Sequence, residues 1–126
     1  MTQYCIKELG PRRPIGDYVS FLWGDGWDCD SDGDAKSRVD PQWTELTLIN
    51  RRNLAERVDV DPCAENPLTL TVRSESGYLA ARLAYALTVT TGGTLSASPE
   101  GPTIAAGELI SQMGDFDLGM ALDRLR

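Results

Sequence analysis

A run of aspartates over residues 25–34 is the part of this sequence whose residue types and spacing could do chemistry. Its centre, Asp28-Cys29-Asp30-Ser31-Asp32-Gly33, matches D-x-D-x-D-G, the opening of an EF-hand calcium loop, in which carboxylate oxygens surround the ion and glycine allows a sharp turn. The twelfth position of such a loop should hold a bidentate glutamate, but Val39 stands there. A solvated acidic contact surface is therefore favoured. A calcium-stabilised binding module is the alternative, with the candidate ligands Asp28, Asp30, Asp32 and Asp34.

Tryptophan accompanies these carboxylates. Trp27 lies inside the Gly- and Asp-rich stretch, which predicts an exposed ring, whereas Trp23 and Trp43 are expected in the core. An aromatic anchor surrounded by charged residues is typical of the positions that dominate protein–protein interfaces. Closely spaced carboxylates also repel one another unless a cation or a basic partner compensates them. The predicted partner-binding residues are Trp27, Asp25, Asp28, Asp30, Asp32 and Asp34.

The chain has no histidine, which restricts its chemistry more than any other feature of the composition. Ser-His-Asp and Cys-His catalysis are excluded within this chain, and the commonest ligand of zinc, iron and copper is missing. The cysteines Cys5, Cys29 and Cys63 are far apart and form no C-x-x-C pair, so neither a disulfide framework nor a zinc site is implied. We therefore expect a non-catalytic protein without a cofactor. The alternative is a small enzyme that works with carboxylates.

The net charge is −7 over 126 residues. Nucleic-acid backbones and anionic membranes both attract clustered lysine and arginine, and the pairs Arg12-Arg13 and Arg51-Arg52 are too few for such a surface. An acidic protein favours basic partners instead. No apolar run approaches the roughly 20 residues that span a bilayer, and no basic segment followed by an apolar one opens the chain. The composition thus indicates a cytoplasmic protein that binds another protein, with neither nucleic acid nor membrane as its partner.

Hydrophobic periodicity predicts the elements that must position the aspartate run, and the length suits a single domain over residues 1–126. An apolar stripe at helical spacing, ended by Gly92-Gly93, suits a helix that covers a sheet; it consists of Leu79, Ala80, Leu83, Ala84 and Leu87. Alternating apolar residues predict the strands. The expected order is a strand over 3–7, a helix over 15–23, a loop over 24–40, strands over 44–49, 57–61 and 68–72, the covering helix, a strand over 94–97 and one or two terminal helices.

This order predicts an α+β fold, an antiparallel sheet of four to five strands with helices packed on one face. The three central strands are separated by turn-rich segments, 50–53 and 61–67, which is typical of a meander. The long loop over 24–40 is unusual in a domain of this size, and such loops are commonly functional or mobile. The aspartate run falls inside it.

The stretch from Tyr78 to Leu95 reads YLAARLAYALTVTTGGTL, an Ala- and Leu-rich helix that passes through Thr-Gly-Gly into a short strand, with Ser98-Pro99-Glu100-Gly101 at the turn behind it. This pattern resembles that of bacterial polymorphic-toxin immunity proteins, which are small and often acidic and cytoplasmic. The resemblance implies a non-catalytic inhibitor that binds and occludes a cognate toxin in the producing cell, its partner being a basic toxin domain. It assigns no contact residue, because such families vary most at their contact surfaces.

Overall fold

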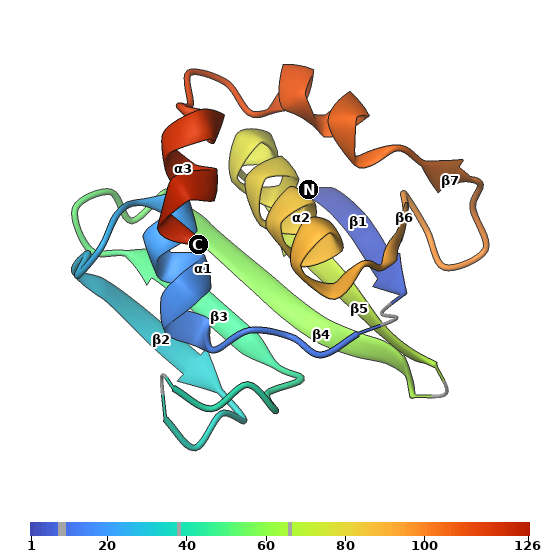
Figure 1. The fold of residues 1–126 in the computed structure, drawn as a ribbon, viewed down its shortest axis with the longest axis horizontal. Coiled ribbons are helices and arrows are strands. Elements are labelled where there is room, and N and C mark those ends of the chain that lie inside the picture. The colour runs from blue at the N-terminus through green and yellow to red at the C-terminus, as the bar shows by residue number, and fades with distance from the viewer. Residues whose placement is uncertain (8–9, 38, 66) are drawn as a thin grey trace.

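The computed structural model describes residues 1–7, 10–37, 39–65 and 67–126, and its strands form one sheet (Figure 1). Helices and strands follow one another along the chain in the expected alternation, with additional short elements. In chain order they are β1 (Thr2–Lys7), α1 (Ile15–Leu22), β2 (Cys29–Gly33), β3 (Leu46–Asn50), β4 (Arg57–Glu65), β5 (Leu68–Ser74), α2 (Gly77–Thr91), β6 (Thr94–Ser96), β7 (Thr103–Ile104), the 3₁₀ helix η1 (Ala106–Gln112) and α3 (Leu118–Arg124).

The sheet is antiparallel, and within the described residues it has seven strands in the order β2-β3-β4-β5-β1-β6-β7. The expected α+β class with an antiparallel sheet is confirmed, whereas the expected number of four to five strands is wrong. β2 forms inside the stretch predicted as a loop, and β7 forms in the tail. β2 was missed because Asp, Ser and Gly are depleted in strands, and its pairing with β3 overrides that preference.

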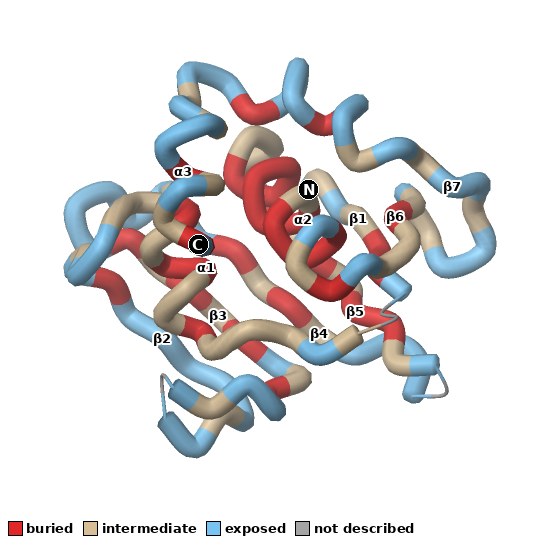
Figure 2. The backbone as a smooth tube through the Cα atoms, in the orientation of Figure 1, coloured by how far each residue is buried: buried red, intermediate tan, exposed pale blue. Residues whose placement is uncertain are grey.

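One face of the sheet is buried. In β4 and β5 every second side chain faces the core, so that Val58, Val60, Leu70 and Val72 are buried. Figure 1 shows α1 and α2 in front of the strands, and red stretches of the strands lie behind these helices in Figure 2. The apolar stripe of α2 is confirmed as core, because 0% of each side chain is exposed: Leu79, Ala80, Leu83, Ala84 and Leu87.

Helix α2 begins after Ser76 and ends at Gly92. Ser76 occupies the N-cap position without a capping hydrogen bond from its side chain, and its N–H donates to the Ser74 Oγ at 3.0 Å. Gly92 adopts a left-handed conformation with φ of 68°, which glycine enters without strain, and its N–H donates to the carbonyl of Thr88. The predicted stop at Gly92-Gly93 is thus confirmed, and the chain turns directly into β6.

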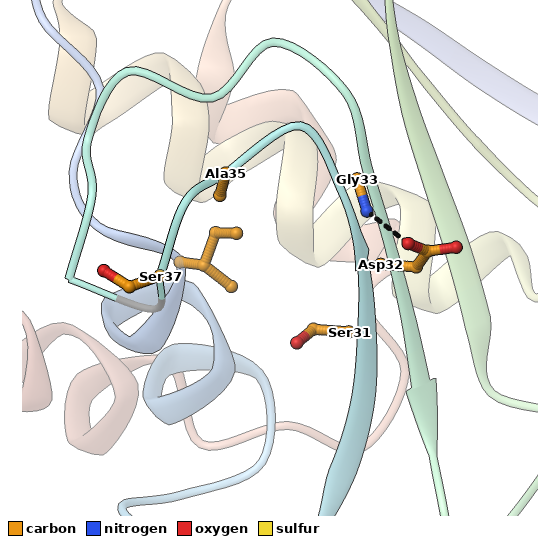
Figure 3. Close-up of a pocket in the computed structure, with 6 residues that line it drawn as sticks. Ser31, Asp32, Gly33, Ala35 and Ser37 are labelled. Atoms are coloured by element: carbon orange, nitrogen blue, oxygen red, sulfur yellow. Dashed lines mark hydrogen bonds between the residues drawn. The ribbon is translucent and has the colours of Figure 1, made fainter.

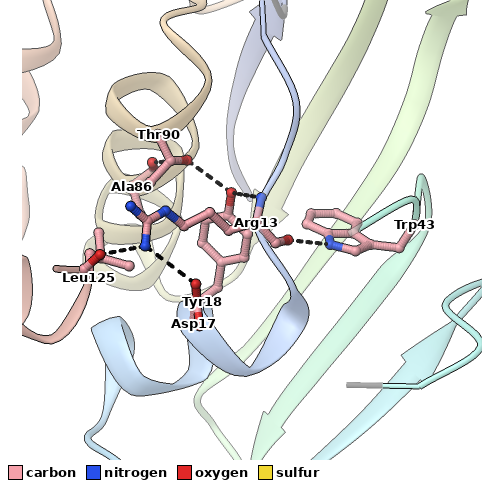
Figure 4. A network of polar contacts seen from close by, with 7 residues as sticks. All are labelled: Arg13, Asp17, Tyr18, Trp43, Ala86, Thr90 and Leu125. Carbon is pink, nitrogen blue, oxygen red and sulfur yellow. Dashed lines mark hydrogen bonds and ion pairs between the residues drawn. The ribbon is translucent and has the colours of Figure 1, made fainter. Parts of the chain in front are cut away.

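A polar network fixes the segment before α1 against α2 and against the connection between β2 and β3 (Figure 4). The Tyr18 hydroxyl lies 2.9 Å from Thr90 Oγ1 and accepts the backbone N–H of Arg13 at 3.1 Å. The Trp43 indole N–H donates to the Arg13 carbonyl at 3.0 Å, and Trp43 is fully buried, which confirms its expected place in the core. The Arg13 guanidinium also donates to the carbonyl of Leu125. These bonds hold the start of α1 against α2, against the segment before β3 and against the end of the chain.

Candidate functional site

The aspartate run lies on and beside an edge strand. β2 is the first strand of the sheet, at the left border in Figure 1, and among the described strands it pairs with β3 alone. Successive side chains of a strand point to opposite faces, so Asp30 and Asp32 share one face and Ser31 points to the other. Asp28 precedes the strand and reaches the same guanidinium as Asp30. We call the side chains of Asp28, Asp30, Asp32 and Arg51 the acidic edge.

Arg51 lies in the turn after β3 and spans two of these aspartates. Its Nη1 lies 3.0 Å from Asp28 Oδ1, its Nε donates to Asp30 Oδ1 at 2.8 Å, and its Nη2 also donates to Asp30. Sequence reasoning assigned this arginine no role. The ion pairs remain in solvent, because 57% of the Asp28 side chain and 54% of the Asp30 side chain are exposed. Exposed pairs of this kind stabilise a fold little and stay open to competition from another charged group.

The other predicted aspartates serve the chain in different ways. Asp34 closes the turn into β3, accepting hydrogen bonds from the Thr44 N–H at 2.7 Å, the Thr44 hydroxyl at 2.6 Å and the Glu45 N–H at 2.8 Å. Burial opposes ionisation of Asp34, but the hydrogen bonds from Thr44 and Glu45 outweigh it and lower the pKa. Asp32 Oδ1 accepts the N–H of Gly33 at 2.9 Å. Asp25 is exposed in the turn before β2.

The arrangement does not have the geometry of an EF-hand loop. Such a loop must curl so that its ligands converge, yet the central residues Cys29–Gly33 are extended in β2. Asp28 and Asp30 face an arginine, and Asp34 faces Thr44 and Glu45. Among the described residues no group of three or more His, Cys, Asp or Glu side chains is placed to hold a metal ion. The four candidate calcium ligands therefore do not form one centre.

Trp27 is held at the side of the core and is not a free aromatic anchor. Its indole N–H donates to Asn50 Oδ1 at 2.9 Å, and the guanidinium carbon of Arg52 lies 4.4 Å from the centre of its ring. Asn50 is buried at the end of β3, and Trp27 packs partly buried against the core. The sequence predicted an exposed ring at Trp27, and this expectation is wrong because tertiary contacts from β3 and the following turn hold it.

A second polar cluster was not anticipated from the sequence. Glu56, directly before β4, accepts hydrogen bonds from the Trp23 indole at 3.0 Å, the Asn50 amide at 2.8 Å and the Tyr78 hydroxyl at 2.6 Å. Burial would raise the pKa of Glu56, but these hydrogen bonds and the charge of nearby Arg82 outweigh it and lower the pKa. We call these four residues, Glu56 with Trp23, Asn50 and Tyr78, the Glu56 cluster. It joins α1, α2 and the β3–β4 turn.

Two hollows flank β2 near Gly33. One of about 230 Å³ lies on the Ser31 side, and Figure 3 shows the side chains around it; it is lined by Ile15, Ser31, Asp32, Gly33, Ala35 and Ser37. The other, of about 240 Å³, bears three carboxylates; it is lined by Asp32, Gly33, Glu45, Leu46, Thr47, Val60 and Asp61. Gly33 is required between them, since a Cβ there would lie 2.0 Å from the Glu45 carbonyl oxygen and its φ is 148°.

The cysteines divide between the core and the surface. Cys29 is buried at the start of β2, Cys5 is buried in β1, and Cys63 is exposed at a bulge of β4. The Cys5 Sγ lies 3.8 Å from Thr71 Oγ1, and none of these three cysteines forms a disulfide within the described residues. Burial raises the pKa of Cys5, and nearby Cys63 raises it further, so the Cys5 thiol is protonated at neutral pH.

No protein-family model matches this sequence, and neither the curated proteins nor the solved structures include a match to it. No helix in the described part of the chain combines the length and the apolar character that crossing a bilayer requires. The assignment of a functional surface therefore rests on geometry and charge. The acidic edge is the place where the predicted residues gather, and the two hollows beside it were not predicted.

Proposed function

We propose that this chain is a non-catalytic protein-binding inhibitor, an immunity protein that binds a cognate bacterial toxin and covers its basic active site. The observation that carries the proposal is the acidic edge, where Asp28, Asp30 and Asp32 lie exposed along an edge strand and Arg51 pairs with two of them. The net charge of −7 gives the whole molecule the same sign. A basic surface is the complementary partner.

Charge steers this encounter. Opposite charges raise the rate of association between two proteins, and the effect weakens as salt screens it. Because the ion pairs of Arg51 are exposed, a lysine or arginine of the partner can exchange with Arg51 at Asp28 or Asp30 without a large loss of stability. Asp25 and Asp34, which are also exposed, lie before and after the acidic edge in the chain, whereas Trp27 is partly buried. Binding then blocks the toxin by occupying its active site, in the cytoplasm of the producing cell.

The rest of the fold supports this use of the edge. We infer that the helices all pack on the buried face of the sheet, which leaves the face with Asp30 and Asp32 turned outward. On that face Asp59 and Asp61 of β4 pair with Arg57 and Arg73. These pairs continue the polar surface inward from β2, while the carboxylates at the edge remain the most accessible.

Capture of the neighbouring gene's product tests the proposal. The purified chain, immobilised through its C-terminus, should retain a basic toxin domain encoded beside its own gene, and should inhibit that toxin's activity. The triple variant Asp28→Asn/Asp30→Asn/Asp32→Asn should bind at least ten times more weakly at low salt, chiefly through slower association. If the chain forms no complex with the product of the neighbouring gene, the proposal is refuted.

A matched control separates the acidic edge from net charge alone. The triple variant Glu65→Gln/Glu100→Gln/Glu108→Gln changes the charge by the same amount at exposed positions outside β2. It should keep most of the wild-type affinity. Equal losses in both triple variants would show that the net charge steers association and that the acidic edge is not the contact surface.

A further inference from the structure

The register of β2 and β3 determines which backbone groups of β2 bond β3 and which face the open edge of the sheet. The Arg51 N–H donates to the Asp28 carbonyl and the Asp34 N–H donates to the Glu45 carbonyl, each at 3.3 Å. In an antiparallel pair, residues that bond their neighbour alternate with residues that do not. With the register of β2 and β3, Asp30 and Asp32 therefore also bond β3, whereas Ser31 directs its N–H and C=O to the other side. The Gly33 N–H points there as well, since it donates to the carboxylate of Asp32.

The two faces of this edge differ in chemistry. On one face stand Asp30 and Asp32, beside the hollow that Glu45 and Asp61 line with further carboxylates. On the other face Ser31 borders the hollow of about 230 Å³, which Ile15 and Ala35 also line. Figure 3 shows Ser31 and Ala35 beside it. An extended chain places alternate side chains on opposite faces. A strand added to β2 would meet an acidic face with one set of side chains and a small, mostly uncharged hollow with the other.

We propose that the edge of β2 receives an extended, basic segment of the partner as an additional antiparallel strand, centred on Ser31. The proposal rests on the proposed function and specifies how the acidic edge is used. The partner residue opposite Ser31 exchanges both backbone hydrogen bonds with it and places a small apolar side chain in the hollow beside Ile15. The residues on either side carry lysine or arginine and face Asp30 and Asp32. Antiparallel addition matches every other pairing of the described sheet.

Charge favours this occupant over a second copy of the chain. Two β2 edges pairing with each other would bring Asp30 and Asp32 of one copy against the same residues of the other, and like charges opposite each other destabilise a strand pair. Inward-facing or edge charges commonly protect proteins from such self-association. A basic segment would instead place positive charges opposite the carboxylates of Asp30 and Asp32, which attract them. The acidic edge thus blocks one kind of strand addition and favours another.

A peptide probe tests the added strand without the toxin. A short fluorescein-labelled peptide of alternating lysine and valine should bind the wild-type chain in fluorescence anisotropy, whereas its glutamate–valine counterpart should not. If valine faces the hollow, the valine N–H groups bond β2. N-methylation of the valine nitrogens should therefore weaken binding at least tenfold, and N-methylation of the lysine nitrogens should change it little. Equal effects of the two methylations, a loss from lysine methylation alone, or no binding of the lysine–valine peptide would overturn the proposal.

A substitution in the chain gives the matching test from the other side. Ser31→Pro removes an N–H that does not bond β3, so the variant should keep its melting temperature and lose at least tenfold in peptide affinity. Retained affinity in a folded Ser31→Pro protein would contradict the added strand. If the variant does not fold, the two methylated peptides on the wild-type chain decide. A dimer of the wild-type chain that Ser31→Pro abolishes would assign the edge to a second copy and overturn the proposal.

These results are distinct from those that test the proposed function. If the peptide binds as described but no toxin is captured, the proposal of an added strand is supported and the proposed immunity function is refuted. If a toxin is captured and Ser31→Pro binds it as tightly as the wild type does, the proposed immunity function is supported and the proposal of an added strand is refuted.

Discussion

The acidic edge and the Glu56 cluster hold carboxylates in opposite ways. At the edge, Asp28 and Asp30 share one exposed guanidinium, that of Arg51. In the cluster, the single carboxylate of Glu56 accepts three hydrogen bonds from three different elements. A dense run of acidic residues is conspicuous in a sequence, but it contributes little to stability when its charges stay in water. The lone Glu56 is inconspicuous and connects α1, α2 and the β3–β4 turn. We therefore expect changes at the acidic edge to alter binding and changes in the Glu56 cluster to alter stability.

The largest effect should come from the Glu56 cluster. Glu56→Ala leaves the Trp23 indole, the Asn50 amide and the Tyr78 hydroxyl without their common acceptor, and should lower the free energy of unfolding by about 2 to 3 kcal/mol. Urea denaturation followed by tryptophan fluorescence measures this loss. Glu65→Ala, at an exposed carboxylate, is the control and should leave the midpoint unchanged. A Glu56→Ala protein as stable as the wild type would show that the cluster does not hold the elements together.

The pH dependence of stability should also follow Glu56. Its pKa is lowered by folding from a value of 4.5, so its contribution is complete above that pH and is lost as pH falls through the lower folded value. Between about pH 6 and about pH 3, the unfolding free energy of Glu56→Gln should therefore fall less steeply than that of the wild type. Glu65→Gln, which removes one carboxylate at an exposed position, is the control for the loss of a single negative charge. Equal slopes for Glu56→Gln and the wild type would contradict the lowered pKa.

At the acidic edge the effect should appear in binding and not in stability. Arg51→Gln removes the cation that Asp28 and Asp30 share, and because all three side chains are exposed the melting temperature should stay unchanged. The edge becomes more negative, so the lysine–valine peptide should bind more tightly at low salt, with the gain disappearing at high salt. Arg126→Gln, at the far end of the chain, is the control for net charge. Weaker binding by Arg51→Gln would mean that Arg51 itself contacts the partner.

Calcium should have the smallest effect. The centre of the aspartate run is an extended strand, and its carboxylates are held by separate partners: Arg51 pairs with Asp28 and Asp30, and Thr44 donates to Asp34. Millimolar Ca²⁺ should therefore neither release heat in titration calorimetry nor raise the melting temperature. Mg²⁺ at the same concentration controls for ionic strength. A rise in melting temperature specific to Ca²⁺ would show that the run rearranges into a metal loop.

The sequence predicted those parts of the fold that have a regular hydrophobic period. The stripe of α2 and the alternation in β4 and β5 mark buried faces directly, so these elements were predicted, although β4 continues to Glu65 through most of the segment 61–67 that was predicted as a turn. β2 has a single buried side chain, that of Cys29, at its first position, and the rest of the strand is exposed. Nothing in such a segment alternates between apolar and polar, so its strand character comes from the partner strand β3.

The candidate site was predicted in part for a related reason. The carboxylates were visible as a run, and Asp28, Asp30 and Asp32 do gather on one edge. Their partners were not visible, because Arg51 is more than twenty residues away and is brought close by the β2–β3 register. The three donors to Glu56 likewise come from separate elements. Contacts of this kind follow from the assembled sheet and leave no local signal.

Hydrogen exchange at a single amide tests the role of the acidic edge most directly. The Ser31 N–H points away from β3, so in the isolated chain it should exchange rapidly with solvent deuterium. When the captured toxin domain is added, exchange at Ser31 should slow markedly, while the amides of Asp30 and Asp32, which already bond β3, change less. Unaltered exchange at Ser31, with protection appearing on another surface of the chain, would place the contact elsewhere and contradict the proposed interface.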